Sequence, residues 1–352
     1  MADNVVISDA TPQDAHYGFA LTQSVEWSYT LECWRRFVAY PQVFWAEAAP
    51  AIGVNGNDGK DVPNEILATS CVFPQGASAT VGSTIVAPEH QRKGLGSKLV
   101  KHDVAFIEAL PENVRPKSLY LSATPAGQPV YERIGFRQIS ETLSWGGELQ
   151  EEHVAQAALE TSARAVEVQH GSISLSDWRQ TVALADAALE LDRSSIMEMM
   201  LLSPDQTGPS EQKTMLTGSL WAALRDERGQ IAAFAAARPL LKGYTVGPLI
   251  ANDRVQAQAL LCGLFMEIAT IGGKDHPPKI QVDIDASTDP KMELRNYLSE
   301  KWGLKETRTQ ALMEYLCQGV QAPGPNEARR ISWEQGRKRP PFQYAMLDLS
   351  AM

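Results

Sequence analysis

A short stretch from Ser83 to Phe106, STIVAPEHQRKGLGSKLVKHDVAF, constrains the fold more than any other part of the chain. A β-branched run reaches a proline, passes through a charged turn with Gly94 and Gly96, and continues with helical spacing of apolar residues. A helix start leaves backbone N–H groups unpaired, and glycines let an anion approach those groups closely. The stretch therefore predicts a strand, an anion-binding turn and a helix within an α/β fold.

The charge of this turn supports a phosphate-bearing ligand, because the whole chain carries a formal net charge of -10. An acidic chain is not expected to bind nucleic acid or an anionic membrane surface, so a basic cluster here predicts a small anionic partner. A Walker A loop is excluded because one residue separates the two glycines, and a dinucleotide fingerprint because Leu99 stands where a third small residue is required. The basic residues of the cluster are Arg92, Lys93, Lys98 and Lys101.

Cysteine usage and the N-terminus predict a cytoplasmic protein. The 4 cysteines are far apart and include no C-x-x-C pair, which is typical neither of a zinc site nor of a disulfide scaffold. The N-terminal residues show no basic start followed by an apolar core, and we expect no run long enough to span a membrane. No metal and no membrane partner are therefore predicted.

The chain is long enough, at 352 residues, for two domains. Strand and helix patterns alternate through the first half, give way to a polar, Ala-rich stretch, and then begin again. We predict a first domain at residues 1–150, a linker at 151–172, and a second domain with a C-terminal tail at 173–352. Residues 54–65 are predicted to form a loop, and the Pro-rich residues 322–349 a surface tail.

Two motifs carry a resemblance to a known family. The pattern Q-x-x-G-x-G, Gln91 to Gly96, follows V-x-P-E directly and resembles the acetyl-CoA pyrophosphate loop of the GNAT superfamily of N-acetyltransferases. The stretch LSATPAGQPVYERIGF, Leu121 to Phe136, resembles the family's next signature, in which a strand is followed by a Tyr-bearing helix and a Gly-Phe pair. In the second half, GYTVGPLIANDRVQAQALL is similar to the GNAT-like domain often called YitH/HolE-type.

This resemblance implies an α/β fold of two tandem GNAT-like domains, each a mixed, mostly antiparallel sheet flanked by helices. It implies an acetyl-CoA-dependent N-acetyltransferase in which the amine of a small molecule attacks the thioester directly. Tyr131 occupies the position of the family's general acid, which protonates the coenzyme A thiolate. The positions implied to bind the cofactor are Ile85, Val86, Gln91, Arg92, Lys93, Gly94, Leu95, Gly96, Ser97 and Thr124.

The two motifs define the residues that would bind and deprotonate the acceptor amine less well than those that would bind the cofactor. Trp27 and Tyr29 are candidates to line the acceptor pocket. The strand before the glycine turn offers hydroxyls but no carboxylate, so the general base is Glu26, Glu89 or a water relay through hydroxyls. The sequence does not choose among these three, and it leaves the acceptor and the oligomeric state open.

The second half lacks the glycine motif after GPLIAND, which implies that only the first domain binds acetyl-CoA. Two alternatives to an N-acetyltransferase follow from this loss and from the missing strand carboxylate. One is a non-catalytic protein that binds acyl-CoA and presents an interaction surface. The other is a GNAT fold diverted to different acyl-CoA chemistry in a biosynthetic pathway.

Overall fold

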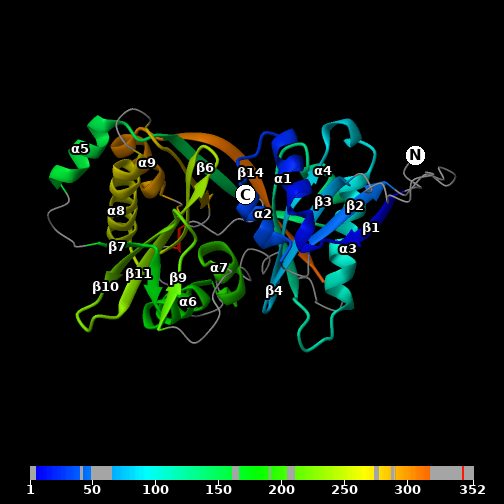
Figure 1. Cartoon of the computed structure of the whole chain (residues 1–352), viewed down its shortest axis with the longest axis horizontal. Helices are drawn as coiled ribbons and strands as arrows, with labels where there is room; N and C mark the ends of the chain where they lie inside the picture. Colours follow the sequence, from blue (N-terminus) through cyan, green and yellow to red (C-terminus); the bar gives the residue numbers. More distant parts are fainter. Residues whose placement is uncertain are drawn as a thin grey trace.

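The computed structural model describes residues 5–39, 43–48, 66–160, 166–189, 192–203, 211–272, 277–286, 289, 291–317 and 343–344. The predicted loop at 54–65 and nearly all of the predicted tail at 322–349 lie outside these residues. Figure 1 shows two lobes joined by the long strands β6 (Arg137–Glu148) and β14 (Lys305–Leu316). The predicted class, an α/β fold with a mixed, mostly antiparallel sheet flanked by helices, is confirmed.

The first lobe follows the predicted alternation of strands and helices. Its elements are β1 (Val5–Asp9), α1 (Ala15–Ser24), α2 (Leu31–Phe37), β2 (Val43–Ala48), β3 (Ile66–Gln75), β4 (Ser78–Val86), α3 (Leu95–Ala109), β5 (Ser118–Ala123), α4 (Gln128–Ile134) and β6. Short 3-10 turns at Pro12–Asp14 and Pro88–His90 precede α1 and α3. Proline at the first position fits such turns because its φ angle is already fixed in the helical range.

The second lobe repeats the same alternation. Its elements are α5 (Glu151–Glu160), β7 (Glu167–His170), β8 (Ser172–Ser174), α6 (Leu175–Leu189), α7 (Ser194–Leu201), β9 (Gln212–Thr214), β10 (Leu220–Arg225), β11 (Ile231–Leu240), β12 (Gly243–Ile250), α8 (Arg254–Gly272), β13 (Lys279–Asp285), α9 (Glu293–Trp302), β14 and β15 (Gln343–Tyr344). The segment predicted as a linker, residues 151–172, forms helix α5 and strand β7 instead. Because β7 pairs with β10, this segment completes the sheet rather than separating two units.

The two lobes exchange the long strands β6 and β14. The main sheet has the order β1-β2-β3-β4-β5-β14-β6-β13-β12-β11-β10-β7, so β14 lies between β5 and β6. Ala311 of β14 pairs with Ala123 of the first lobe, and Asp285 of β13 pairs with Thr142 of β6. Each lobe therefore receives a strand from the other, and one continuous sheet runs through both predicted domains.

Helices α3 and α8 provide the main cover of one face of this sheet. Apolar residues on the inner side of α3, Leu99 and Ile107 among them, are fully buried. Among the described residues, α8 is the one helix long and apolar enough to span a membrane, with a mean hydropathy of 1.4. This differs from the expectation that no run reaches that length, and the reason is that α8 packs Leu260, Leu264 and Phe265 into the core of the second lobe.

Candidate active site

A wedge between β4 and β5 forms the centre of the candidate site. The two parallel strands pair only at their starts, from Ser78 opposite Ser118 to Thr80 opposite Tyr120. Beyond Thr80 they diverge, and no strand in the described part of the chain pairs with that edge of β4. The backbone N–H and C=O groups of this edge are therefore available to an extended ligand that carries amide groups.

A β-bulge in β4 shapes the wedge. Gly82 pairs with Cys71 and Ile85 pairs with Thr69, so two residues of β4 lie opposite Ser70 alone. One of them, Ser83, has a φ angle of 49°, a left-handed conformation that costs energy for a residue other than glycine. The other is Thr84, which lines the open groove. The extra residue thus turns a hydroxyl toward the site.

The N-terminus of α3 adjoins this edge. Gly94 is the N-cap, with a φ angle of 85°, and a Cβ atom placed there would meet nothing within 4 Å. Glycine is therefore suited to this position by its backbone conformation and not by a lack of space. Within the described residues no side chain caps the helix, and the first intrahelical bond runs from the Lys98 N–H to the Gly94 carbonyl at 3.0 Å. The amides of the first turn are thus directed at any ligand in the groove.

The wedge, the glycine turn and α4 enclose a groove of about 630 Å³. Helix α4 begins after a turn in which the Thr124 carbonyl accepts hydrogen bonds from the Gly127 and Gln128 N–H groups, each at 2.9 Å. The described residues that line the groove are Thr84, Val86, Gln91, Arg92, Gly94, Leu95, Gly96, Ser97, Ala126, Gly127, Val130, Tyr131 and Arg133. One wall is therefore rich in backbone donors and the other carries a phenol.

Tyr131 faces the wedge from α4. Its ring packs edge-on against Phe136, with the ring centroids 6.0 Å apart. Burial raises the pKa of the hydroxyl to about 12, and a hydrogen bond with the Thr84 side chain offsets part of that shift. The phenol therefore keeps its proton at neutral pH, as a general acid must.

Seven of the ten predicted cofactor positions line the groove; they are Val86, Gln91, Arg92, Gly94, Leu95, Gly96 and Ser97. The other three do not line it. The Ile85 side chain is buried in the core, the Lys93 ammonium donates to the Glu89 carbonyl at 2.7 Å, and the Thr124 hydroxyl accepts from the Gly127 N–H at 3.2 Å. Their direct contact with a cofactor stays a prediction.

The structure does not bring Trp27 and Tyr29 to the groove. Tyr29 is 1% exposed and packs edge-on against Trp34 and Phe37, with centroid distances of 6.2 and 5.8 Å. Trp27 packs against the same aromatic cluster, 6.0 Å from the Tyr29 ring. Both residues serve the core here, so their predicted contact with an acceptor has no support from the groove. The same holds for the two candidate bases, Glu26 and Glu89, neither of which lines it.

Sequence reasoning missed a buried carboxyl group next to the wedge. Asp103 of α3 is 0% exposed, and the Ser70 hydroxyl donates a hydrogen bond to its Oδ2. Burial raises the pKa of Asp103 to about 7, and the bond from Ser70 offsets part of the shift. A signal was present, because Asp103 stands four residues after Leu99 and four before Ile107, within the buried stripe of the helix.

In the second lobe, α8 occupies the place that α3 has in the first lobe. Side chains at the start of α8 already accept hydrogen bonds from the backbone N–H groups there. The Asp253 carboxylate accepts from the Gln256 N–H at 2.8 Å, and the Gln256 side chain accepts from the Asn252 N–H at 3.0 Å. The wedge beside it is filled as well, because Leu249 and Ile250 of β12 pair with β15. A carboxylate and a strand therefore occupy the places that the first lobe leaves open.

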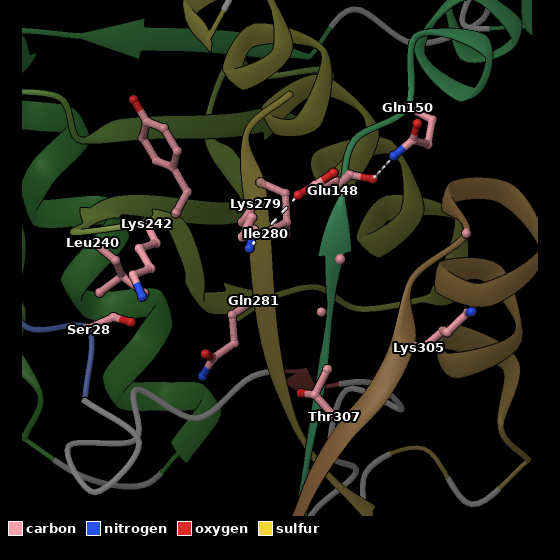
Figure 2. A pocket seen from close by; sticks show the side chains of 14 residues that line it. Ser28, Glu148, Gln150, Leu240, Lys242, Lys279, Ile280, Gln281, Lys305 and Thr307 are labelled. Atoms are coloured by element: carbon pink, nitrogen blue, oxygen red, sulfur yellow. Dashed lines mark hydrogen bonds and ion pairs between the residues drawn. The ribbon is translucent and has the colours of Figure 1, made fainter. Parts of the chain in front are cut away.

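A second cavity, of about 580 Å³, lies where the end of β6 meets the starts of β12, β13 and β14. Figure 2 shows three lysines around it, Lys242, Lys279 and Lys305, with Lys279 paired to Glu148 at 3.8 Å. A strand of the length of β6 spans about 35 Å, and Tyr131 lies near its opposite end. This basic cavity is therefore separate from the groove.

The described residues contain no group of three or more His, Cys, Asp or Glu side chains arranged to bind a metal ion. All four cysteines are buried and none forms a disulfide. Neither finding adds a functional group to the groove. Its polar groups are the backbone of the glycine turn, the hydroxyls of Thr84, Ser97 and Tyr131, the Gln91 amide and two arginine side chains.

Comparisons with known proteins agree with the geometry. Two models described as acetyltransferase (GNAT) domain match residues 44–138 and 182–323. A Bacillus subtilis protein described as uncharacterized N-acetyltransferase YitH is 22% identical over 223 residues, which cover 63% of this chain and 67% of that protein.

Solved structures show a similar fold across nearly the whole chain. A candidate acetyltransferase from Pyrococcus horikoshii superposes with a TM-score of 0.61 at 14% identity, covering 99% of this chain and 96% of the other. A tandem GNAT protein from the clavulanic acid biosynthesis pathway superposes with a TM-score of 0.54 at 8% identity, covering 90% of this chain and 100% of the other. At these identities the likeness concerns the fold alone.

Proposed function

This chain belongs to the GNAT family of acetyltransferases, and we propose that its first lobe transfers the acetyl group of acetyl-CoA to the amine of a small molecule. The groove carries this proposal, because in it the uncapped start of α3 lies opposite Tyr131 across an open strand edge. Those features match the two ends of the donor, a pyrophosphate and an acetyl thioester joined by an amide-bearing arm.

Binding is supported by the groups left open in the groove. The first-turn amides of α3 would hold the pyrophosphate, aided by Arg92 and Arg133, which also line the groove. The free edge of β4 would pair with the amide-bearing arm and direct the thioester carbonyl toward the bulge. Acetyl-CoA supplies the activated acetyl group, and the chain supplies its orientation.

Tyr131 is proposed as the general acid. Its phenol stays protonated at neutral pH and lies at the wedge, where the leaving sulfur is expected. An alkyl amine has a pKa near 10, so the acceptor arrives charged and must lose a proton before it attacks. The site therefore also needs a proton acceptor.

A small acceptor is proposed because the groove has the size of a small-molecule site. Its volume of about 630 Å³ lies within the range of about 300–1,000 Å³ that such sites have.

One acetyl-CoA should bind per chain, and not two. The second lobe places the Asp253 carboxylate at the helix start and β15 in the wedge, so both halves of a second cofactor site are filled. Isothermal titration calorimetry of the full chain with coenzyme A checks this number. A stoichiometry of two would contradict the assignment of cofactor binding to the first lobe.

The reaction is tested with acetyl-CoA and a panel of amino acids, polyamines and amino sugars. Free thiol is measured colorimetrically and acetylated amine by mass spectrometry, and we expect equal amounts of both for at least one amine. Thiol release without acetylated amine would instead indicate different acyl-CoA chemistry. Binding of acetyl-CoA without any thiol release would indicate a non-catalytic protein.

A further inference from the structure

Strand β4 contains no carboxylate, yet an ammonium acceptor must give up a proton before it can attack the thioester. We infer that Asp103 of α3 is this proton acceptor, and that it receives the proton of the acceptor amine through the hydroxyls of Thr84 and Ser70. The inference rests on the proposed function and assigns it a base. Asp103 does not touch the groove, so it acts through the two hydroxyls as a positioning residue.

The route consists of three side chains on three elements. Thr84 of β4 lines the groove at the bulge, where it also bonds with the Tyr131 hydroxyl. Its Oγ1 lies 3.2 Å from the Oγ of Ser70 on β3. The Ser70 hydroxyl in turn donates to Asp103 Oδ2. An unbroken series of hydrogen bonds therefore joins the groove to a carboxyl group beneath the sheet.

The surroundings of Asp103 suit a group that changes its protonation state. Its second oxygen, Oδ1, has no hydrogen-bond partner among the described residues. No cation is bonded to it there either, so the ionised form is not fixed by an ion pair. Burial raises the pKa to about 7, which makes both forms accessible near neutral pH.

The titratable groups near Asp103 do not change their own charge over the pH range in which Asp103 titrates. Burial raises the pKa values of Cys71 on β3 and Tyr131 on α4, and the nearby Asp103 charge raises both further. Both are therefore neutral near pH 7. Strand β4 contributes no charged side chain, and the one charged side chain of β2, Glu47, is bonded to Ser8.

The proton balance of the step is simple. The N–H bond of the ammonium breaks, its electron pair becomes the lone pair that attacks, and the proton passes to Thr84. Thr84 passes its own proton to Ser70, and Ser70 passes its proton to the Asp103 carboxylate, which becomes a carboxylic acid. Both hydroxyls are unchanged, and the stored proton returns to water by the same route. Tyr131 gives its own proton to the leaving sulfur, and the second proton that the nitrogen loses after attack restores the phenol through Thr84, which is bonded to it.

Kinetics of Asp103→Asn test this route. We expect kcat to fall about 100-fold while the Kd for acetyl-CoA stays unchanged, because the variant removes a proton acceptor and no binding group. The base must be ionised, so the wild-type rate should rise with pH through about 7, and this rise should be absent in the variant.

Thr84→Val should give the same loss of kcat as Asp103→Asn, whereas Thr84→Ser, which keeps the hydroxyl, should retain most activity. Thr181→Val, which removes a buried hydroxyl from α6, is the control and should behave as the wild type.

Infrared spectroscopy of the protonated Asp103 carboxyl provides a readout without turnover. Its band, identified by its loss in Asp103→Asn, should shift when coenzyme A is added to the wild type, and should not shift in Thr84→Val. A shift without transfer to any amine would contradict the proposed function while supporting the route. Transfer with unchanged kcat and pH profile in Asp103→Asn would overturn the inference and leave the proposed function standing. Absence of both transfer and shift would overturn both.

Discussion

Gly94→Glu should raise the Kd for acetyl-CoA about 100-fold or more and abolish turnover at ordinary cofactor concentrations. The new carboxylate would stand at the N-cap of α3, where the proposed pyrophosphate site begins. Two like charges about 5 Å apart repel by about 3 kcal/mol at an effective dielectric constant of about 20. Since 1.4 kcal/mol corresponds to a factor of ten in Kd, about two orders of magnitude follow.

Two further variants separate charge from backbone strain. Gly94→Ala imposes the left-handed conformation on a residue with a Cβ, at a cost of about 1–2 kcal/mol, but adds no charge. Gly229→Glu is the matched control, because Gly229 also has a positive φ of 76° with nothing within 4 Å of a Cβ, yet lies in the turn between β10 and β11. Calorimetric titration with acetyl-CoA measures all three. Full affinity in Gly94→Glu would place the pyrophosphate elsewhere.

The sequence predicted the parts of the molecule that depend on neighbouring residues. The strand, glycine turn and helix around Gly94 are contiguous, so their geometry follows from local spacing and from the freedom of glycine to adopt a positive φ. Helix α4 could be placed for the same reason, since it follows directly after β5 and carries Tyr131. Two short sequence motifs therefore predict most of the residues that line the groove.

The exchange of β6 and β14 between the lobes could not be predicted from the sequence, and the reason is physical. Alternation of apolar and polar residues determines which face of a strand is buried, but not which strand lies beside it. Strand β6 satisfies its pattern equally well against β14 and β13 or against β5, and only the whole sheet selects the first arrangement. The expected boundary near residue 150 marks the end of β6 in the chain, and not the edge of a separate sheet.

The proton path was missed because its members are distant in the sequence. Ser70 and Asp103 come from different elements, and a lone serine in a strand gives no signal. Asp103 did give one, as a carboxylate within an apolar stripe, but such a residue is informative only when its partners are known. Tyr29 shows the opposite error, because an aromatic residue before a helix is compatible with a pocket and with a core, and here it packs in the core.

Tyr131→Phe should lower kcat about 100-fold and leave the Kd for acetyl-CoA unchanged. The substitution removes one hydroxyl and keeps the ring that packs against Phe136, so the groove should retain its shape. General acid catalysis contributes about 100-fold to 10,000-fold to rate, and the lower value is expected because water can protonate part of the leaving thiolate. Single-turnover measurements of thiol release separate this chemical step from product release.

Tyr315→Phe is the control for Tyr131→Phe. The Tyr315 ring also packs against Phe136, at 5.3 Å, and its hydroxyl donates to Glu108 at 3.1 Å, outside the groove. Burial raises the pKa of both phenols to about 12, so both are neutral over the working range and neither causes a decline in rate at moderately alkaline pH. Loss of activity in Tyr131→Phe alone would therefore report the position of one hydroxyl at the wedge. Equal losses in both would indicate a packing effect at Phe136 and would remove Tyr131 from the chemistry.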